Sequence, residues 1–350
     1  MAPRSFRPFL RDGIFVSDTL KKMQKKRVLS GIRASGRLHL GNYLGAVKGM
    51  LALQESPEYE TFYMVADLHT LTTPYNPKTL KSDVREVILD YLGAGLDPEK
   101  SVIFVQSQVP EHIELSYLFS TSVSLAKMLH LPTYKEKLKL HPHDSTVALL
   151  YYPVLMAADI LVYKADMVPV GIDQEPHLEV TREIARKMNS IYSTSFPEPK
   201  RFETEGGYIP SLTGEGKMSK SVEGSYINLT DDLATIKAKL AKAPTDSGKG
   251  EKVPKEGGVS ALLTLVELFG GKEKRQGYEK VYTSSGIKYS ELKEGLSEAI
   301  YKALLPIQEK RRYFEERPDE IDRIISQGAQ KAGKVASATL AETKQAMGLI

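Results

Sequence analysis

A short segment with two lysines three residues apart could bind a polyphosphate and neutralise its charge. The segment reads KMSKS from Lys217 to Ser221, and glycines flank it at positions 214, 216 and 224. Two ammonium groups on a glycine-flanked loop can close over a triphosphate and follow its charge as pyrophosphate leaves. The alternative is a solvated lysine loop that binds no ligand. The spacing favours phosphate chemistry.

A second candidate phosphate site lies near the N-terminus, where an apolar run leads into a glycine-containing turn. The turn holds Ser35 and Gly36, and the sequence continues as His39-Leu40-Gly41-Asn42 where a helix is expected to start. A strand, a turn and a helix start present backbone N–H groups and the positive end of the helix dipole to an anion. His39 and Asn42 would add side-chain donors. A tight turn without a ligand is the alternative.

A lone carboxylate in an apolar helix is the third candidate for chemistry. Tyr152, Met156 and Asp159 are spaced so that they share one helix face, and Pro153 is expected close to the start of that helix. A buried carboxylate without a donor is costly, so some partner must reach Asp159. That partner is either a ligand or an internal cation such as Lys164 or Arg182.

The elements that must position these residues follow a regular alternation. Strands are expected at 27–32, 61–66, 101–106 and 167–170, and helices at 41–54, 78–92, 111–129, 153–163 and 173–189. Strands separated by helices of this length indicate crossover units. They predict an α/β fold with a doubly wound parallel sheet, in which ligands bind at the carboxyl ends of the strands.

The character of the chain changes near residue 230, where β-branched runs disappear. Helical spacing is found at 231–243, 259–269 and 289–305 and over most of 306–348, with a polar loop at 244–258. We therefore expect a nucleotide-binding domain at 28–228 and an all-helical domain at 229–350. Residues 1–27 carry a local excess of six positive charges. We expect a mobile, dispensable tail there, with phosphate-backbone contact as the alternative.

Composition excludes several classes of protein. The 350 residues are 41% hydrophobic and 26% charged with a net charge of +4, as expected of a globular chain. With zero cysteines, a disulfide framework, a thiolate zinc site and an iron–sulfur cluster are ruled out, and a reducing cytoplasm is the expected location. No apolar run approaches the length of a membrane span, so no membrane is expected. The segment His141-Pro142-His143-Asp144 has ligand-like residues, but no structural metal is expected there.

Two of these motifs together resemble the signatures of class I aminoacyl-tRNA synthetases. His39-Leu40-Gly41-Asn42 is similar to the "HIGH" signature, with Asn42 in place of the second histidine, and Lys217 to Ser221 matches "KMSKS". Gly41-Asn42-Tyr43 resembles the tryptophanyl and tyrosyl members. The segment 152–161 resembles the tryptophanyl helix, where a methionine packs on the indole and an aspartate accepts its N–H. Tyrosyl members have glutamine at the position of Met156.

The resemblance implies a role for individual residues. It implies ATP contacts by Arg33, Ala34, Ser35, Gly41, Asn42, Gly171, Ile172, Asp173, Ile209, Lys217, Met218, Ser219, Lys220 and Ser221. It implies catalytic roles for His39, Asn42, Lys137, Lys217 and Lys220, with Lys135 as a further phosphate contact. It implies a tryptophan pocket made by Tyr152, Met156, Asp159, Gln174 and His69.

Four residues of the expected ATP site depart from the family pattern or have a second interpretation. Ile172 stands where a glutamate is usual, so only its backbone can contact ATP, and Arg33-Ala34 replace the more familiar Gln-Pro. Asp173 is expected to accept from ribose hydroxyls. A helix N-cap would explain Asp173 equally well.

The activity implied by the resemblance is the ligation of tryptophan to tRNA(Trp) with ATP. Tryptophan would attack the α-phosphate, and no general base is required because its carboxylate is already ionised at pH 7. Mg²⁺ would arrive with ATP, and a cytoplasmic homodimer is implied. The alternatives are a tyrosine–tRNA ligase and a non-catalytic RNA-binding paralogue.

Overall fold

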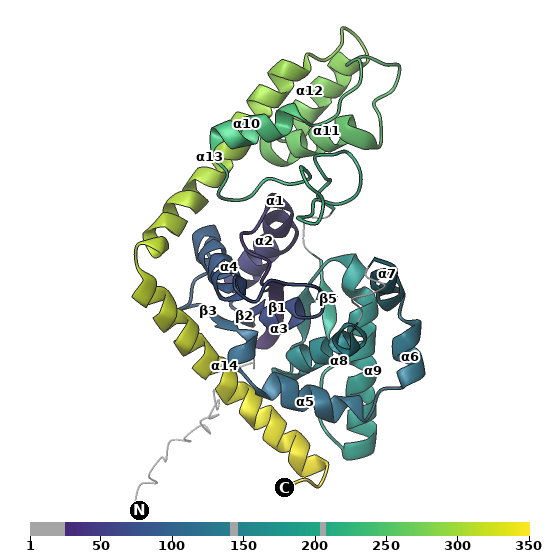
Figure 1. The fold of residues 1–350 in the computed structure, drawn as a ribbon, viewed down its shortest axis with the longest axis vertical. Coiled ribbons are helices and arrows are strands. Elements are labelled where there is room, and N and C mark those ends of the chain that lie inside the picture. The colour runs from purple at the N-terminus through teal and green to yellow at the C-terminus, as the bar shows by residue number, and fades with distance from the viewer. Residues whose placement is uncertain (1–24, 141–145, 204–207) are drawn as a thin grey trace, which may run out of the picture.

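The computed structural model describes residues 25–140, 146–203 and 208–350. At its centre lies a sheet of five parallel strands in the order β3-β2-β1-β4-β5 (Figure 1). The strands are β1 (Lys26–Arg33), β2 (Tyr59–Ala66), β3 (Ser101–Val105), β4 (Met167–Pro169) and β5 (Lys200–Phe202). The predicted parallel sheet is confirmed.

The register of the strands brings their carboxyl ends to one edge. Arg33 at the end of β1 lies opposite Ala66 of β2, and Val65 lies opposite Val105 of β3. On the other side β1 pairs with β4, so the strand order reverses between β1 and β4. Ligands of open α/β sheets bind outside the carboxyl ends at such a reversal, which is where the site must be sought.

Helices cover both faces of the sheet because its strands are apolar on both sides. Val28, Tyr63 and Ile103 belong to one buried cluster, and their chain neighbours Leu29, Phe62 and Phe104 belong to another. Successive side chains of a strand point to opposite faces, so the two clusters mark the two layers. This is the doubly wound arrangement that the alternation predicted.

The first cluster packs against helices near the N-terminus, and the second against helices from the middle of the chain. On the first side lie α1 (Leu40–Asn42), the π-helical turn η1 (Tyr43–Val47), α2 (Lys48–Gln54) and α4 (Leu80–Ala94). On the second side lie α5 (Glu111–Ser120), α8 (Val147–Val162) and α9 (Glu175–Tyr192). Shorter elements connect them: α3 (Asp67–Thr70), η2 (Gln106–Gln108), α6 (Leu125–His130), α7 (Pro132–Leu140) and η3 (Ile172–Gln174).

The expected single helix at 111–129 is wrong, because the chain breaks between α5 and α6. The hydroxyls of Thr121 and Ser122 donate to the carbonyls of Leu118 and Phe119. Such side-chain bonds compete with helix continuation. Several other elements were not predicted, among them the helices α7 and α12 (Lys272–Tyr282) and the strand β5. Strand β5 is a three-residue edge strand, and α12 buries only Tyr282.

The expectation that Pro153 lies near a helix start is also wrong. Helix α8 begins at Val147 and continues through Pro153, which cannot donate a hydrogen bond to Leu149. Burial of most residues of α8 between the sheet and its neighbours offsets this loss. Pro306 is likewise inside a helix, α13 (Tyr289–Glu315), which therefore runs well beyond the predicted end at residue 305.

The last part of the chain is helical and comprises α10 (Leu233–Ala241), α11 (Gly257–Gly270), α12, α13 and α14 (Pro318–Ala346). Helices α10 to α12 lie beyond α1, while α13 and α14 run down the β3 side of the sheet (Figure 1). Helix α14 returns to the sheet and packs against β3 and α5. A Cβ built on Gly328 of α14 would lie 1.7 Å from the Ile103 carbonyl oxygen, so glycine permits this close approach. The C-terminal helix thus contributes to both halves of the fold.

Two sequence expectations fall outside the described residues. They concern residues 1–24 of the basic tail and the segment His141–Asp144. In the part of the chain that the structure describes, no helix combines the length and the apolar character needed to cross a membrane.

Candidate active site

The first signature lies directly after the turn that follows β1, where the sheet topology places a ligand. His39 precedes helix α1, and its backbone N–H donates to Asn42 Oδ1 at 3.2 Å. This bond uses the oxygen of Asn42, so the amide nitrogen is the group that could donate to a phosphate. A Cβ on Gly41 would lie 2.9 Å from the His39 ring and 3.3 Å from Met218 Cβ. Glycine is therefore needed at position 41, because a larger residue would collide with His39 and crowd Met218.

His39 is buried and electrically neutral at neutral pH. Burial, together with the nearby charges of Lys220 and Lys217, lowers the pKa of His39 to about 4. Its Nδ1 is buried without a hydrogen-bond partner in the described part of the chain. A neutral imidazole can donate one hydrogen bond to an anion without adding a third charge to the two lysines.

The second signature forms an irregular hairpin packed against the first. Lys217 pairs with Pro210, the Met218 N–H donates to the Ile209 carbonyl at 2.9 Å, and Met218 is buried. Lys220 reaches across to the turn after β1, where its ammonium donates to the Ser35 carbonyl at 2.7 Å. The two signatures, far apart in sequence, thus lie together as the resemblance implies.

Glycines and serines shape this hairpin. Gly214, Gly216 and Gly224 have φ values of 84°, 70° and 75°, which other residues rarely adopt. Ser219 and Ser225 hydrogen-bond to each other through backbone and hydroxyl groups, and the Ser221 N–H donates to Ser219 Oγ at 3.3 Å. The serines therefore hold the loop in shape, while Lys217 is exposed.

The remaining residues expected to contact ATP lie around the same edge of the sheet. Arg33 and Ser35 are exposed, and the Ala34 N–H donates to the Thr70 hydroxyl at 3.0 Å. Ile209 is buried with its carbonyl already paired to Met218, and among the described residues its N–H has no backbone acceptor, so this N–H could donate to a ligand. Lys137 lies in α7, but its side chain lies outside the described part of the chain, and Lys135 is exposed.

Gly171, Ile172 and Asp173 form the turn between β4 and α9. Ile172 is 74% exposed, and the Asp173 carboxylate folds back so that its Oδ1 lies 2.4 Å from a Cβ built on Gly171. The alternative role of Asp173 as a helix N-cap is wrong, because Gln174 occupies the N-cap of α9 and no side chain caps that helix. Asp173 instead accepts from the Gln174 amide at 2.7 Å.

A cavity of about 610 Å³ opens between β1, β2, α8 and the start of α9. Its lining includes every residue expected in the amino-acid pocket, together with Arg33 and Asp173 from the expected ATP site: Tyr152, Met156, Asp159, Gln174, His69, Arg33 and Asp173. The rest of the wall is mostly apolar and includes Leu29, Met64, Ile160 and Val168. A volume of this size, apolar with a few polar groups, is suited to a small ligand.

Asp159 is fully buried and accepts three hydrogen bonds from residues that the structure describes. His69 Nε2 lies 2.7 Å from Oδ2, while Gln106 Nε2 and His112 Nδ1 lie 2.8 and 2.6 Å from Oδ1. The internal partners considered from the sequence are wrong, because Lys164 pairs with Glu342, and Arg182 pairs with glutamates of its own helix. A carboxylate offers about four acceptor positions, so one remains on Oδ2 for a ligand.

These neighbours keep Asp159 ionised. Burial by itself raises the pKa of the Asp159 carboxyl. The charge of His69 and the hydrogen bonds from His112 and His69 lower this pKa by a larger amount. The pKa therefore lies well below its ordinary value. At neutral pH Asp159 is therefore a pure acceptor, and a ligand must bring it a donor.

Sequence reasoning missed the residues behind Asp159. Gln106 follows strand β3 at its carboxyl end, a position that parallel sheets favour for binding groups and the one signal that could have found it. His112 in α5 and Tyr163 after α8 carry no local signature. They meet Asp159 only because the sheet brings α5 and α8 together.

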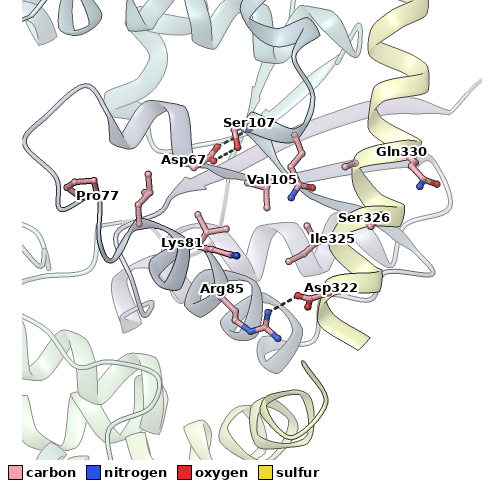
Figure 2. Close-up of a pocket in the computed structure, with 14 residues that line it drawn as sticks. Asp67, Pro77, Lys81, Arg85, Val105, Ser107, Asp322, Ile325, Ser326 and Gln330 are labelled. Carbon is pink, nitrogen blue, oxygen red and sulfur yellow. Dashed lines mark hydrogen bonds and ion pairs between the residues drawn. The ribbon is translucent and has the colours of Figure 1, made fainter. Parts of the chain in front are cut away.

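A second cavity, of about 820 Å³, lies between α4 and α14 and contains none of the predicted site residues (Figure 2). Its charged groups are mostly engaged already. Arg85 pairs with Asp322 at 2.7 Å, and Asp67 accepts from the Ser107 N–H and hydroxyl. Within the described ranges no three His, Cys, Asp or Glu side chains are grouped as metal ligands would be.

Comparison with known proteins agrees with the geometry. The family model for tRNA synthetases class I (W and Y) matches residues 21–305. The chain is 40% identical to the tryptophan–tRNA ligase of Porphyromonas gingivalis over 329 residues, which covers 92% of this chain and 98% of that protein. It also matches the crystal structure of tryptophanyl-tRNA synthetase from Mycoplasma pneumoniae with a TM-score of 0.80 and 32% identity, covering 93% and 98% of the two chains.

The Campylobacter jejuni tryptophanyl-tRNA synthetase, solved in complex with ADP and tryptophan, matches with a TM-score of 0.79 and 31% identity over 92% of this chain and 100% of that one. The residues matched by the family model include both signatures and every residue that lines the cavity beside them. The protein therefore belongs to the class I tRNA synthetases of the tryptophan and tyrosine group.

Proposed function

We propose that this protein is a tryptophan–tRNA ligase. It joins the carboxylate of L-tryptophan to the α-phosphate of ATP, releases pyrophosphate, and then transfers tryptophan to the 3′-terminal adenosine of tRNA(Trp). The observation that carries the choice of amino acid is Asp159, a buried, ionised acceptor in the wall of a largely apolar cavity. The names of the relatives support the same choice.

The cavity suits an indole better than other side chains. Met156 offers a polarisable thioether to an aromatic face, and Tyr152, fixed by a 2.9 Å hydrogen bond to His177, adds an aromatic wall. The indole N–H would donate to the open position on Asp159 Oδ2. Gln174 at the mouth would receive the amino group, and His69 edges the pocket beside Asp159.

Alignment and charge carry the first reaction, since the attacking carboxylate needs no base. His39, Asn42, Lys217 and Lys220 would surround the triphosphate, with Lys137 approaching from α7. As the bond between the α- and β-phosphates breaks, negative charge grows on pyrophosphate, and the ammonium groups of the second signature stabilise it. Lys220 would exchange the Ser35 carbonyl for a phosphate oxygen.

Mg²⁺ enters this proposal only with ATP. Since no group of three or more His, Cys, Asp or Glu side chains among the described residues could hold the ion, we expect phosphate oxygens to supply ligands to it. The ion would neutralise phosphate charge when bound, and the residues named above act independently of its position.

The second reaction and the surroundings of the enzyme complete the proposal. The 2′-hydroxyl of the terminal adenosine would attack the activated carbonyl, as in class I enzymes. Residues 28–228 would form the catalytic domain, residues 229–350 the helical anticodon-binding domain, and residues 1–27 a separate tail. We expect a homodimer in the cytoplasm, for which sedimentation analysis and cell fractionation are the direct tests.

Amino-acid-dependent ATP–pyrophosphate exchange tests the proposed function. Tryptophan should support exchange and tyrosine should not, whereas the reverse would assign a tyrosine–tRNA ligase. Exchange with neither would leave a non-catalytic RNA-binding protein. Because the chain contains no tryptophan, the fluorescence of added tryptophan can be followed directly. Asp159→Ala should weaken tryptophan binding by roughly 1 to 3 kcal/mol, since the indole N–H loses its acceptor.

A further inference from the structure

Behind Asp159 lies a row of buried polar groups that does not reach the cavity. Gln106, His112 and Tyr163 are completely or almost completely buried, and none of them is among the described residues that line the pocket. A row of buried polar side chains is costly unless every member is satisfied. The hydrogen bonds of this row determine what Asp159 can do.

The donor and acceptor roles along the row can be assigned from its ends. Burial raises the pKa of Tyr163, so its hydroxyl keeps its proton. That hydroxyl lies 2.7 Å from His112 Nε2 and is hydrogen-bonded to it, while the ionised Asp159 can only accept, so His112 Nδ1 must carry a hydrogen. His112 Nδ1 then donates to Asp159 Oδ1 at 2.6 Å.

The orientation of the Gln106 side-chain amide follows from the partner of its oxygen. Its Oε1 accepts from the Leu68 N–H at 3.1 Å, so its amide nitrogen must face Asp159, 2.8 Å from Oδ1. Both donors therefore saturate Oδ1. Oδ2, to which the described residues supply only His69, is left with the open acceptor position toward the cavity.

The position of the row is rigid. Tyr163 stacks on Phe62 with ring centroids 4.7 Å apart and meets Phe104 edge-on at 5.6 Å, so its hydroxyl cannot swing away. Supporting groups of this kind commonly fix the orientation of a binding residue.

We propose that His112 and Tyr163 are positioning residues for substrate selection: they occupy Oδ1 of Asp159 and thereby hold Oδ2 as an ionised acceptor aimed at the N–H of the aromatic substrate. The inference rests on the proposed function and adds residues that act only through Asp159. It predicts that losing either residue weakens recognition of the N–H donor specifically, rather than binding in general.

The test compares tryptophan with β-(1-benzothiophen-3-yl)-L-alanine, an analogue of similar shape whose sulfur replaces the N–H. Dissociation constants for both are measured by calorimetry on the full chain, and their ratio is the readout. Tyr163→Phe removes one hydroxyl and should reduce the preference for tryptophan by about threefold to tenfold. His112→Leu should reduce it at least tenfold, and His112→Asn, which keeps a donor near the place of Nδ1, should restore part of it.

Tyr63→Phe is the matched control. Tyr63 is a fully buried tyrosine of β2 whose hydroxyl donates to the Met50 carbonyl on the other face of the sheet. Its variant should leave the ratio within twofold of the wild type. Should His112→Leu fail to fold, Tyr163→Phe decides the question by itself.

Two results would overturn the inference in different ways. Equal weakening of both ligands by Tyr163→Phe would show that the row is merely structural, while the proposed function would stand. A wild-type protein that binds both ligands equally would refute Asp159 as the indole acceptor, and the positioning role with it.

Discussion

Arg311 of α13 and Asp90 of α4 form a buried ion pair that connects the helical part of the chain to the first signature. The Arg311 guanidinium binds Asp90 Oδ1 and also Glu86 at 2.6 Å, and Asp90 Oδ2 accepts from the Leu38 N–H at 2.5 Å. Leu38 directly precedes His39. Burial raises the pKa of Asp90 to about 6, against the opposing charge of Arg311, so the pair remains ionised at pH 7.

Removing the cation should therefore be far more damaging than removing a surface charge. Arg311→Met leaves the buried Asp90 without its cation and also removes a partner of Glu86 and Glu315, and breaking such a buried pair costs about 3 to 5 kcal/mol. Its exposed neighbour Arg312 is the control, for which Arg312→Met should change stability by less than about 0.5 kcal/mol. Urea unfolding measures both. Equal effects would mean that the ion pair adds nothing to stability.

Two glycines of α14 should respond in opposite directions to the same substitution. Gly328→Ala places a methyl group against the Ile103 carbonyl, so α14 must move away from β3, at a cost of about 1 to 3 kcal/mol. Gly333 has open space around its Cβ position, and Gly333→Ala should stabilise the helix by about 0.5 to 1 kcal/mol. Thermal unfolding midpoints give the comparison. A stabilised Gly328→Ala variant would contradict the close packing of α14.

His39 should titrate far below a normal histidine. Its pKa of about 4 in the folded chain lies below the ordinary value of 6.5. Its contribution to stability is therefore complete above pH 6.5 and is lost as the pH falls toward 4. Histidine NMR signals followed from pH 8 to pH 5 should show no titration of His39. In Lys220→Ala the midpoint should rise, since one of the charges that lower the pKa is gone. A midpoint near 6.5 in the wild type would contradict the burial of this ring.

Lys220→Ala should slow adenylate formation by at least tenfold and leave tryptophan affinity nearly unchanged. The reason is that Lys220 lies at the phosphate end of the site, beside Ser35, and is absent from the residues lining the tryptophan cavity. Single-turnover kinetics measures the first quantity and fluorescence titration the second. Lys331→Ala, on the exposed side of α14, is the control. Equal losses in rate and affinity would rule out a role confined to the transition state.

Local sequence patterns were sufficient to predict the parallel sheet and to identify both signatures. The alternation of β-branched and helical runs predicted four of the five strands and their parallel arrangement, because periodicity and crossover length are local properties. The predictions were wrong or incomplete where tertiary packing offset a local penalty, or where an element had too weak an apolar pattern to be recognised. Pro153 lies inside α8 because burial of that helix offsets a missing hydrogen bond, and α12 escaped notice because it buries little.

The sequence by itself determined which chemical groups this protein could use: the two signatures, the lone carboxylate among apolar residues and the absence of cysteine. Only the tertiary structure decided which of these side chains contact one another. A carboxylate in an apolar helix indicated that Asp159 needs a hydrogen-bond donor. The sequence did not identify the donors Gln106 and His112, which are 53 and 47 residues away. The contact between Arg311 and Asp90 spans 221 residues. Local periodicity fixes the face on which a side chain lies, whereas the packing of whole layers selects the group that faces it.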